Sequence, residues 1–258
     1  MSKLLRADLY RLLRGGLMKA LLIVNGLFTA VVAVILRTEA YFDSWLHGTD
    51  VADFHNAVLL MLLLNALLFC PLFVRSCVSG GGMARRLAAG YSARKIALSA
   101  ALTAFIFVAA LYALECAVCY PCALSPWCGY GAAGTVSAHF QRILGGFALA
   151  LAYCSCFVFL SFCFRHGATA LIACALALLF AWGWYDWFGR VLEYFIGSGI
   201  GVPVTVVVTL AVQGLSPHAI LMTAFGGYGG WALYIACGVV FAVLYHCLCT
   251  VVLRRKSF

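Results

Sequence analysis

The chain has 258 residues, of which 66% are hydrophobic and only 10% are charged, and its formal net charge is +9. A soluble protein carries about a quarter charged residues, so this composition excludes an ordinary soluble domain and favours an integral membrane protein. The basic residues flank apolar runs, and no soluble segment is long enough to bind nucleic acid. The positive charge therefore indicates contact with anionic lipid headgroups or an acidic partner surface.

The first elements expected along the chain are a short amphipathic helix over 2–14 and a first span over 17–36. The helix is too short to cross a membrane and is typical of a helix lying at the membrane interface. Its predicted apolar face carries Leu5, Leu9, Leu12 and Leu13, and its polar face carries Lys3, Asp8, Arg11 and Arg14. The run 17–36 matches the thickness of the hydrocarbon core and ends at Arg37 and Glu39 rather than at a cleavage site. We therefore expect a retained span and no cleavable signal peptide.

Five further spans are predicted at 54–74, 96–118, 140–163, 168–187 and 228–252. The connector 75–95 carries five basic residues, and we expect a short helix over 83–89 within it, broken at Gly90. Residues 189–217 are apolar but interrupted by Gly and Pro, so we expect two short helices that dip into the outer leaflet and return. Residues 1–258 thus form a single all-α transmembrane domain: six spans, an interfacial helix and a re-entrant-like segment before the last span.

The distribution of basic residues predicts the orientation of these spans. When alternate connectors are assigned to opposite sides of the membrane, all of the 17 Lys and Arg residues except Arg37, Arg142 and Arg190 fall on one side. Cytoplasmic loops collect Lys and Arg. Both termini and the connector 75–95 are therefore expected in the cytoplasm.

Few polar side chains fall inside the predicted spans. Glu115 lies near the outer end of the third span, where we expect headgroups to solvate it, and a proton or ion role is the alternative. His246 is expected to be a packed, neutral side chain, and Asn25, Asn56 and Asn65 to hydrogen-bond between spans.

Four cysteines cluster at the outer end of the third span, at positions 116, 119, 122 and 128. Their spacing matches no zinc or iron–sulfur pattern well. They are either unpaired small residues or contain a disulfide on the oxidising outer face, with Cys119 and Cys128 as the candidates. A metal site is the third and least favoured interpretation.

No catalytic or nucleotide-binding motif is present in the sequence. The run 197–199 resembles part of a protease GxSG signal, but Ile196 breaks the pattern and no histidine is arranged to activate Ser198. The sequence contains no HExxH and no G-x-x-x-x-G-K-[ST]. We expect no catalytic residues, no metal and no cofactor bound by this chain, so that any ATP it uses is hydrolysed by another polypeptide.

The ordered layout resembles the permease subunits of type-2 ABC exporters. The shared features are a basic amphipathic N-terminal helix, six spans, a basic connector after the second span and a Gly/Pro-interrupted segment before the last span. The most specific stretch is 82–99, GMARRLAAGYSARKIALS, which is similar to the family's cytoplasmic segment of a short helix, a Gly, a Ser-Arg-like pair and the entry to the third span. Here that pair is spread as Ser92 and Arg94, and Gly80 to Gly82 stand where the family often has a Glu.

The resemblance implies a permease of an ATP-driven exporter in a bacterial cell membrane. Two permeases, as a homodimer or with a related second permease, would form the pathway, each resting on a separate ATPase subunit that binds ATP and Mg²⁺. The N-terminal helix and the segment 83–95 would contact that subunit, the latter through Met83, Arg85, Arg86, Leu87, Tyr91, Arg94 and Lys95. The segment 189–217 would form a lid at the exit, with an outer gate at Gly197, Ser198, Gly199 and Pro203.

Other functions fit the same composition. The alternatives are an ATP-independent channel or secondary carrier, and a membrane-embedded enzyme or assembly factor. The basic residues of 83–95 would then touch only lipid and water. The scarcity of polar side chains in the spans favours an amphipathic or apolar cargo if the chain transports one.

Overall fold

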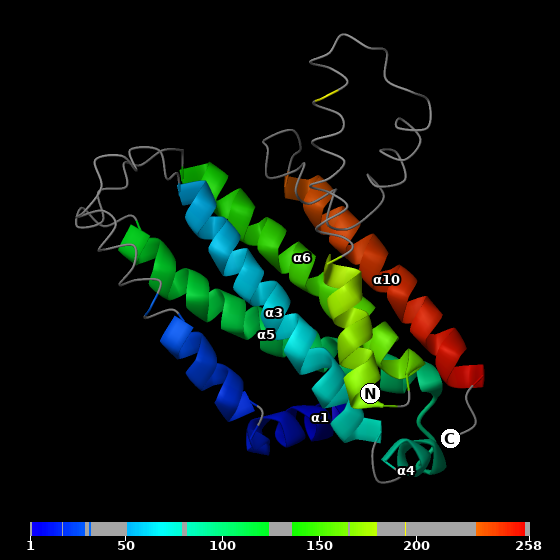
Figure 1. Ribbon diagram of the computed structural model, residues 1–258. Helices are drawn as coiled ribbons and strands as arrows, with labels where there is room; N and C mark the ends of the chain where they lie inside the picture. Colours follow the sequence, from blue (N-terminus) through cyan, green and yellow to red (C-terminus); the bar gives the residue numbers. More distant parts are fainter. Residues whose placement is uncertain are drawn as a thin grey trace.

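The computed structural model describes residues 2–16, 18–28, 31, 51–78, 82–123, 136–164, 166–179, 194 and 231–255, and the regular structure in these ranges is helical. Figure 1 shows the long helices lying side by side as a bundle. The labelled helices are α1 (Ser2–Arg14), α3 (Val51–Val78), α4 (Gly82–Ala88), α5 (Ala93–Ala123), α6 (Val136–Cys163) and α10 (Trp231–Arg255). Two shorter apolar helices cover Met18–Phe28 and Gly167–Leu179.

In the part of the chain that the structure describes, four helices are long and apolar enough to cross a membrane. Their apolar stretches are Val58–Val78, Ala93–Val118, Ile143–Cys163 and Gly238–Arg255, which correspond to the predicted second, third, fourth and sixth spans. The predicted first and fifth spans are described only in part, as the two shorter helices. The dipping segment 189–217, with its gate residues Gly197, Ser198, Gly199 and Pro203, lies outside the described residues apart from position 194. The protein is therefore a membrane-embedded helical bundle.

The observed helices extend beyond the predicted spans at most ends. The helix α3 continues through Pro71 to Val78, where the sequence predicted an end at 74. Hydropathy marks only the hydrocarbon core, whereas a helix can continue through the headgroup region. A proline within a transmembrane helix is tolerated when neighbouring groups satisfy the freed backbone carbonyl.

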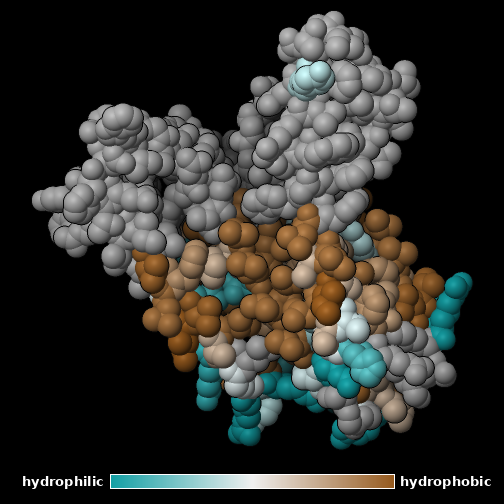
Figure 2. All heavy atoms as spheres, in the orientation of Figure 1, coloured by the Kyte–Doolittle hydropathy of each residue, from teal (hydrophilic) through white to brown (hydrophobic). Residues whose placement is uncertain are grey.

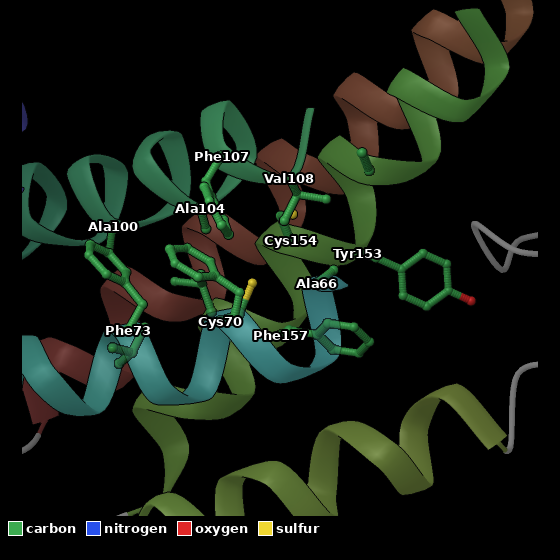
Figure 3. Packing of buried hydrophobic residues seen from close by; sticks show 14 of the residues in the cluster. Ala66, Cys70, Phe73, Ala100, Ala104, Phe107, Val108, Tyr153, Cys154 and Phe157 are labelled. Atoms are coloured by element: carbon green, nitrogen blue, oxygen red, sulfur yellow. The ribbon is translucent and has the colours of Figure 1, made fainter. Parts of the chain in front are cut away.

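Small side chains let the central helices approach closely. The helix α6 packs against α3, α5 and α10, and α3 also packs against α5. Figure 3 shows Ala66 and Cys70 of α3 beside Ala104 and Val108 of α5 and Cys154 of α6. The ring of Phe69 lies against that of Phe107, with 4.3 Å between centroids. Association of helices in lipid depends on such close packing, because burial of apolar surface gives no driving force there.

A glycine allows the contact between α6 and α10. A Cβ atom added at Gly238 would lie 2.7 Å from the carbonyl oxygen of Ala148, which is too close for any larger residue without a shift. On the other side of α6, Gly146 accommodates the hydroxyl group of Tyr112 in the same way. Gly238 and Gly146 therefore allow α10 and the Tyr112 side chain of α5 to pack closely against α6.

One end of the bundle collects the charged residues. The helices α1 and α4, the C-terminal ends of α3 and α10 and the start of α5 all lie at this end (Figure 1). Figure 2 shows hydrophilic side chains here and a hydrophobic surface along the bundle above them. We call this the basic end, defined by Lys3, Arg6, Arg11, Arg14, Arg75, Arg85, Arg86, Arg94, Lys95, Arg254 and Arg255.

Candidate functional site

The candidate site is α4 and the elements that hold it at the basic end. The helix occupies Gly82–Ala88, close to the predicted 83–89, and its end at Gly90 is confirmed. Gly90 has φ +80°, its N–H donates to the Leu87 carbonyl at 2.9 Å, and the Tyr91 N–H donates to the Arg86 carbonyl at 3.1 Å. This pair of bonds is the Schellman arrangement, which needs a residue in the left-handed region and favours glycine there. The sharp turn directs the chain straight into α5.

The helix α4 has an inward and an outward face. Met83 is buried in the core and Arg86, one turn later, is only 11% exposed. Ala84, Arg85, Leu87 and Ala88 are exposed, and Leu87 leaves 39% of its surface uncovered. The outward face thus exposes one large apolar side chain, Leu87, and one basic side chain, Arg85.

Asp8 fixes the inward face of α4. Both guanidinium nitrogens of Arg86 donate to its carboxylate, Nη1 to Oδ2 at 3.3 Å and Nη2 to Oδ1 at 2.5 Å. Ser99 Oγ donates to Oδ2 at 2.7 Å, and Cys77 Sγ lies 3.9 Å from Oδ1. Asp8 is only 1% exposed. Its carboxylate links α1, to which Asp8 belongs, with α3, α4 and α5.

The side chains around Arg86 favour its charged form. Although burial opposes the charged form of Arg86, the neighbouring Cys77 and Asp8 side chains raise the pKa of the guanidinium above its ordinary value. Forked, charge-assisted hydrogen bonds fix orientation as well as distance. Removing one partner of a buried pair leaves an uncompensated charge, which costs about 3–5 kcal/mol. The pair therefore holds α4 against α1.

The predicted faces of α1 were wrong in one respect. Asp8 was expected on the polar face with Lys3, Arg11 and Arg14, but it lies in a buried stripe with Leu4 and Leu12. Of the predicted apolar residues, Leu12 is buried, Leu5 and Leu9 are half-buried, and Leu13 is 61% exposed. The stripe runs through positions i, i+4 and i+8, because α1 packs on α5 rather than lying wholly on lipid.

The two basic residues of α1 assigned to the interfacial helix lie toward its C-terminal end. Arg11 Nη1 donates to the Ser76 carbonyl at the end of α3, at 3.5 Å. The guanidinium of Arg14 lies 4.7 Å from the centre of the Tyr10 ring, which is cation–π geometry. Both side chains are exposed, as expected for an interfacial helix at the basic end.

The remaining residues of the predicted coupling segment lie where α5 begins. Tyr91 packs partly against the core, whereas Arg94 and Lys95 are exposed. Ser92 caps α5, since its Oγ accepts from the Lys95 N–H at 3.4 Å. The structure therefore brings the predicted segment together around one turn, and sequence reasoning missed Asp8 as a residue that contacts it. Its signal was that it is the only acidic residue in 2–14.

The other predicted polar sites have different outcomes. Glu115 was expected among lipid headgroups, but it is buried and accepts a hydrogen bond from Asn65. Cys116 is a free, buried thiol. The side chains of Cys119 and Cys128, the candidate disulfide, lie outside the described residues. Among the side chains that the structure describes, no three of His, Cys, Asp or Glu are grouped to hold a metal ion.

Comparisons with known proteins give no family for this chain. No protein-family model matches it, and no curated protein sequence matches it at a significant level. A function must therefore be argued from the geometry of the basic end and from the layout of the sequence.

Proposed function

We propose that this protein is the membrane-spanning permease subunit of an ATP-driven ABC exporter of the type-2 kind. It has no ATP-binding motif of its own and works with a separate ATPase subunit that binds ATP and Mg²⁺. A second permease copy, or a related permease, completes the pathway. The complex resides in a bacterial cell membrane, with six spans per permease and both termini in the cytoplasm.

The observation that carries this proposal is the two-faced mounting of α4. The helix lies between the ends of two candidate spans, α3 and α5, and the Asp8–Arg86 pair ties it to a third element. A force applied to its outward face is therefore transmitted to both spans and to α1, because the inward face cannot slide freely. Such rigid-body coupling suits a subunit that is moved by a motor in another chain.

Charge also supports an ATPase partner at this end. The outward face of α4 presents Arg85, and the exposed Arg94 and Lys95 lie just beyond its turn. Positive-inside asymmetry supports a cytoplasmic location for this end, on the side where an ATPase would find its ATP. An acidic groove on the ATPase, with a pocket for Leu87, is the complementary surface that we expect.

The direct test is extraction of the protein in mild detergent from its native membrane. We expect a P-loop ATPase to co-purify and its ATP hydrolysis to depend on the permease. The variant Arg85→Glu, which reverses the outward charge without touching the Asp8 pair, should lose both. Arg254→Glu is the matched control, because Arg254 is basic, exposed and at the same end but belongs to α10. The proposal fails if no ATPase is retained and transport persists without ATP.

The orientation has its own test. Cysteine introduced at Ala88, on the exposed face of α4, should resist a thiol reagent that cannot cross the membrane of intact cells and react after permeabilisation. Labelling of intact cells would place α4 outside, away from ATP. That result would leave the ATP-independent channel or carrier as the better function.

A further inference from the structure

A second polar cluster lies inside the bundle, away from the basic end. Asn25 of the helix Met18–Phe28, Asn65 in the middle of α3 and Glu115 of α5 meet at hydrogen-bonding distance. All three are buried, and Glu115 is only 2% exposed. The surroundings are apolar, since Asn65 is flanked on α3 by the buried core residues Leu62 and Phe69.

The two asparagines form a reciprocal pair that uses all their donors. Asn25 Nδ2 donates to Asn65 Oδ1 at 2.8 Å and to the Leu21 carbonyl at 2.7 Å. Asn65 Nδ2 donates to Asn25 Oδ1 at 2.7 Å and to Glu115 Oε1 at 3.3 Å. An amide NH₂ group has two N–H donors, so both groups are saturated. Neither asparagine has a donor left for the second oxygen of Glu115.

That second oxygen, Oε2, is buried and has no hydrogen-bond partner among the described residues. No charged side chain in the described part faces it: the neighbouring helices contribute Asn25 and Asn65, and α5 itself contributes Cys116 and Tyr112 as the nearby titratable groups. An ionised carboxylate in this position would be uncompensated within the membrane, which costs several kcal/mol. Within the described residues, Oε2 is thus the one side-chain oxygen of the three residues that has no hydrogen-bond partner.

We propose that Glu115, framed by Asn25 and Asn65, is a binding site for a single monovalent cation, either a proton or an alkali-metal ion. The ligand binds at Oε2, while Oε1 stays on the Asn65 amide. This site requires no ATPase partner, so the test of the site is independent of the test of the proposed function.

Infrared difference spectroscopy of the purified full-length protein in phosphatidylcholine–phosphatidylglycerol vesicles tests the site. In the first arm, pH is varied with choline as the only added cation; in the second, Na⁺ or K⁺ is added at fixed pH. Proton binding gives a carboxylic-acid band that rises on acidification, and metal binding gives a shift of the carboxylate band on addition of the ion. The chain has eight Asp and Glu side chains, so the Glu115 signal is the part of either response that is present in the wild type and absent in Glu115→Gln. A Glu115 carboxyl signal that responds to neither ligand overturns the proposal.

Two further variants test whether the response comes from Glu115. Asp8→Asn removes the other described buried carboxylate, which is already paired with Arg86, and should leave the response unchanged. Asn65→Ala keeps Glu115 but removes the donor to Oε1, so the responding band should shift rather than vanish. A response that disappears in Asp8→Asn and survives in Glu115→Gln would assign it to the basic end and overturn the site.

Discussion

Two carboxylates are buried among the residues that the structure describes, and their surroundings differ. Asp8 at the basic end receives a forked guanidinium and a serine hydroxyl. Glu115 inside the bundle receives one asparagine amide on one oxygen and nothing on the other within the described residues. A charge that is fully compensated by its own chain serves to hold elements together, whereas an incompletely compensated one has capacity for a ligand. The same residue chemistry therefore points to a mechanical role at one end and to binding in the interior.

Their neighbours reinforce the difference. The partners of Asp8 come from the ends of α3 and α5 and from α4, so the pair organises a junction between short segments. The described partner of Glu115 is Asn65, which lies in the interior of α3 and is itself paired with Asn25, and Oε2 is left without a partner. Stability measurements on variants of each cluster test this distinction.

The largest effect is expected from Arg86→Met. The variant keeps most of the side-chain volume but leaves Asp8 buried without its cation, so we expect a loss of about 3–5 kcal/mol in the free energy of unfolding. Unfolding in mixed micelles, followed by circular dichroism, measures it. Arg85→Met is the control, because Arg85 is exposed on the outward face of the same helix, and its effect should be much smaller.

The double variant Asp8→Asn with Arg86→Met completes this test. Removing both charges should recover most of the stability, since the cost of the single change lies in the unpaired charge rather than in lost attraction. A double variant as unstable as Arg86→Met would show that Asp8 is not the residue that requires Arg86.

Much of this architecture could be predicted from the sequence, and the reasons are local. The bounds of α1 and the break at Gly90 follow from short-range chemistry, namely the length of the amphipathic run and the need for a left-handed residue. Four of the spans follow from hydropathy over windows as long as the membrane is thick. These features need no knowledge of which helices touch.

The partners of Asp8 and Glu115 could not be found in this way. Arg86 and Ser99 are 78 and 91 residues from Asp8, and Asn65 is 50 residues from Glu115. Helical periodicity put Asp8 on the polar face because periodicity sees one helix at a time, while burial depends on α5 packing over it. Likewise, the position of Glu115 near the end of a predicted span suggested headgroups, but its depth is set by α3 and the helix Met18–Phe28.

The second largest effect is expected inside the bundle, from Asn65→Leu. The change removes the reciprocal amide pair and leaves Asn25 Oδ1 and Glu115 Oε1 without their donor. Interhelical hydrogen bonds of this kind contribute about 1–2 kcal/mol each in membranes, so we expect a loss of that order. The same unfolding measurement applies. Ser155→Ala is the control, because Ser155 bonds only to the Leu151 carbonyl of its own helix among the contacts described.

A smaller effect is expected from Ser99→Ala at the basic end. The hydroxyl is one of several donors to Asp8, and the guanidinium of Arg86 remains in place. Loss of a single hydrogen bond costs about 1 kcal/mol. Thr103→Ala on the same helix is the control, since the Thr103 hydroxyl donates to the Ser99 carbonyl of its own helix at 2.8 Å. A loss as large as that of Arg86→Met would make the serine, rather than the salt bridge, the main support of the carboxylate.

The smallest effect on stability is expected from Glu115→Gln, and it separates the two carboxylates most directly. Glutamine keeps an oxygen for the Asn65 amide and removes the ionisable group, so no partner within the chain is lost. One hydrogen bond contributes about 1 kcal/mol to stability, and the change in the free energy of unfolding should be smaller than that. Asp8→Asn, the same substitution chemistry at the basic end, should cost clearly more because it leaves Arg86 with a weaker acceptor. If Glu115→Gln were instead the more damaging of the two, Oε2 would have to hold a structural partner, and the interior carboxylate would be a second clamp rather than a binding site.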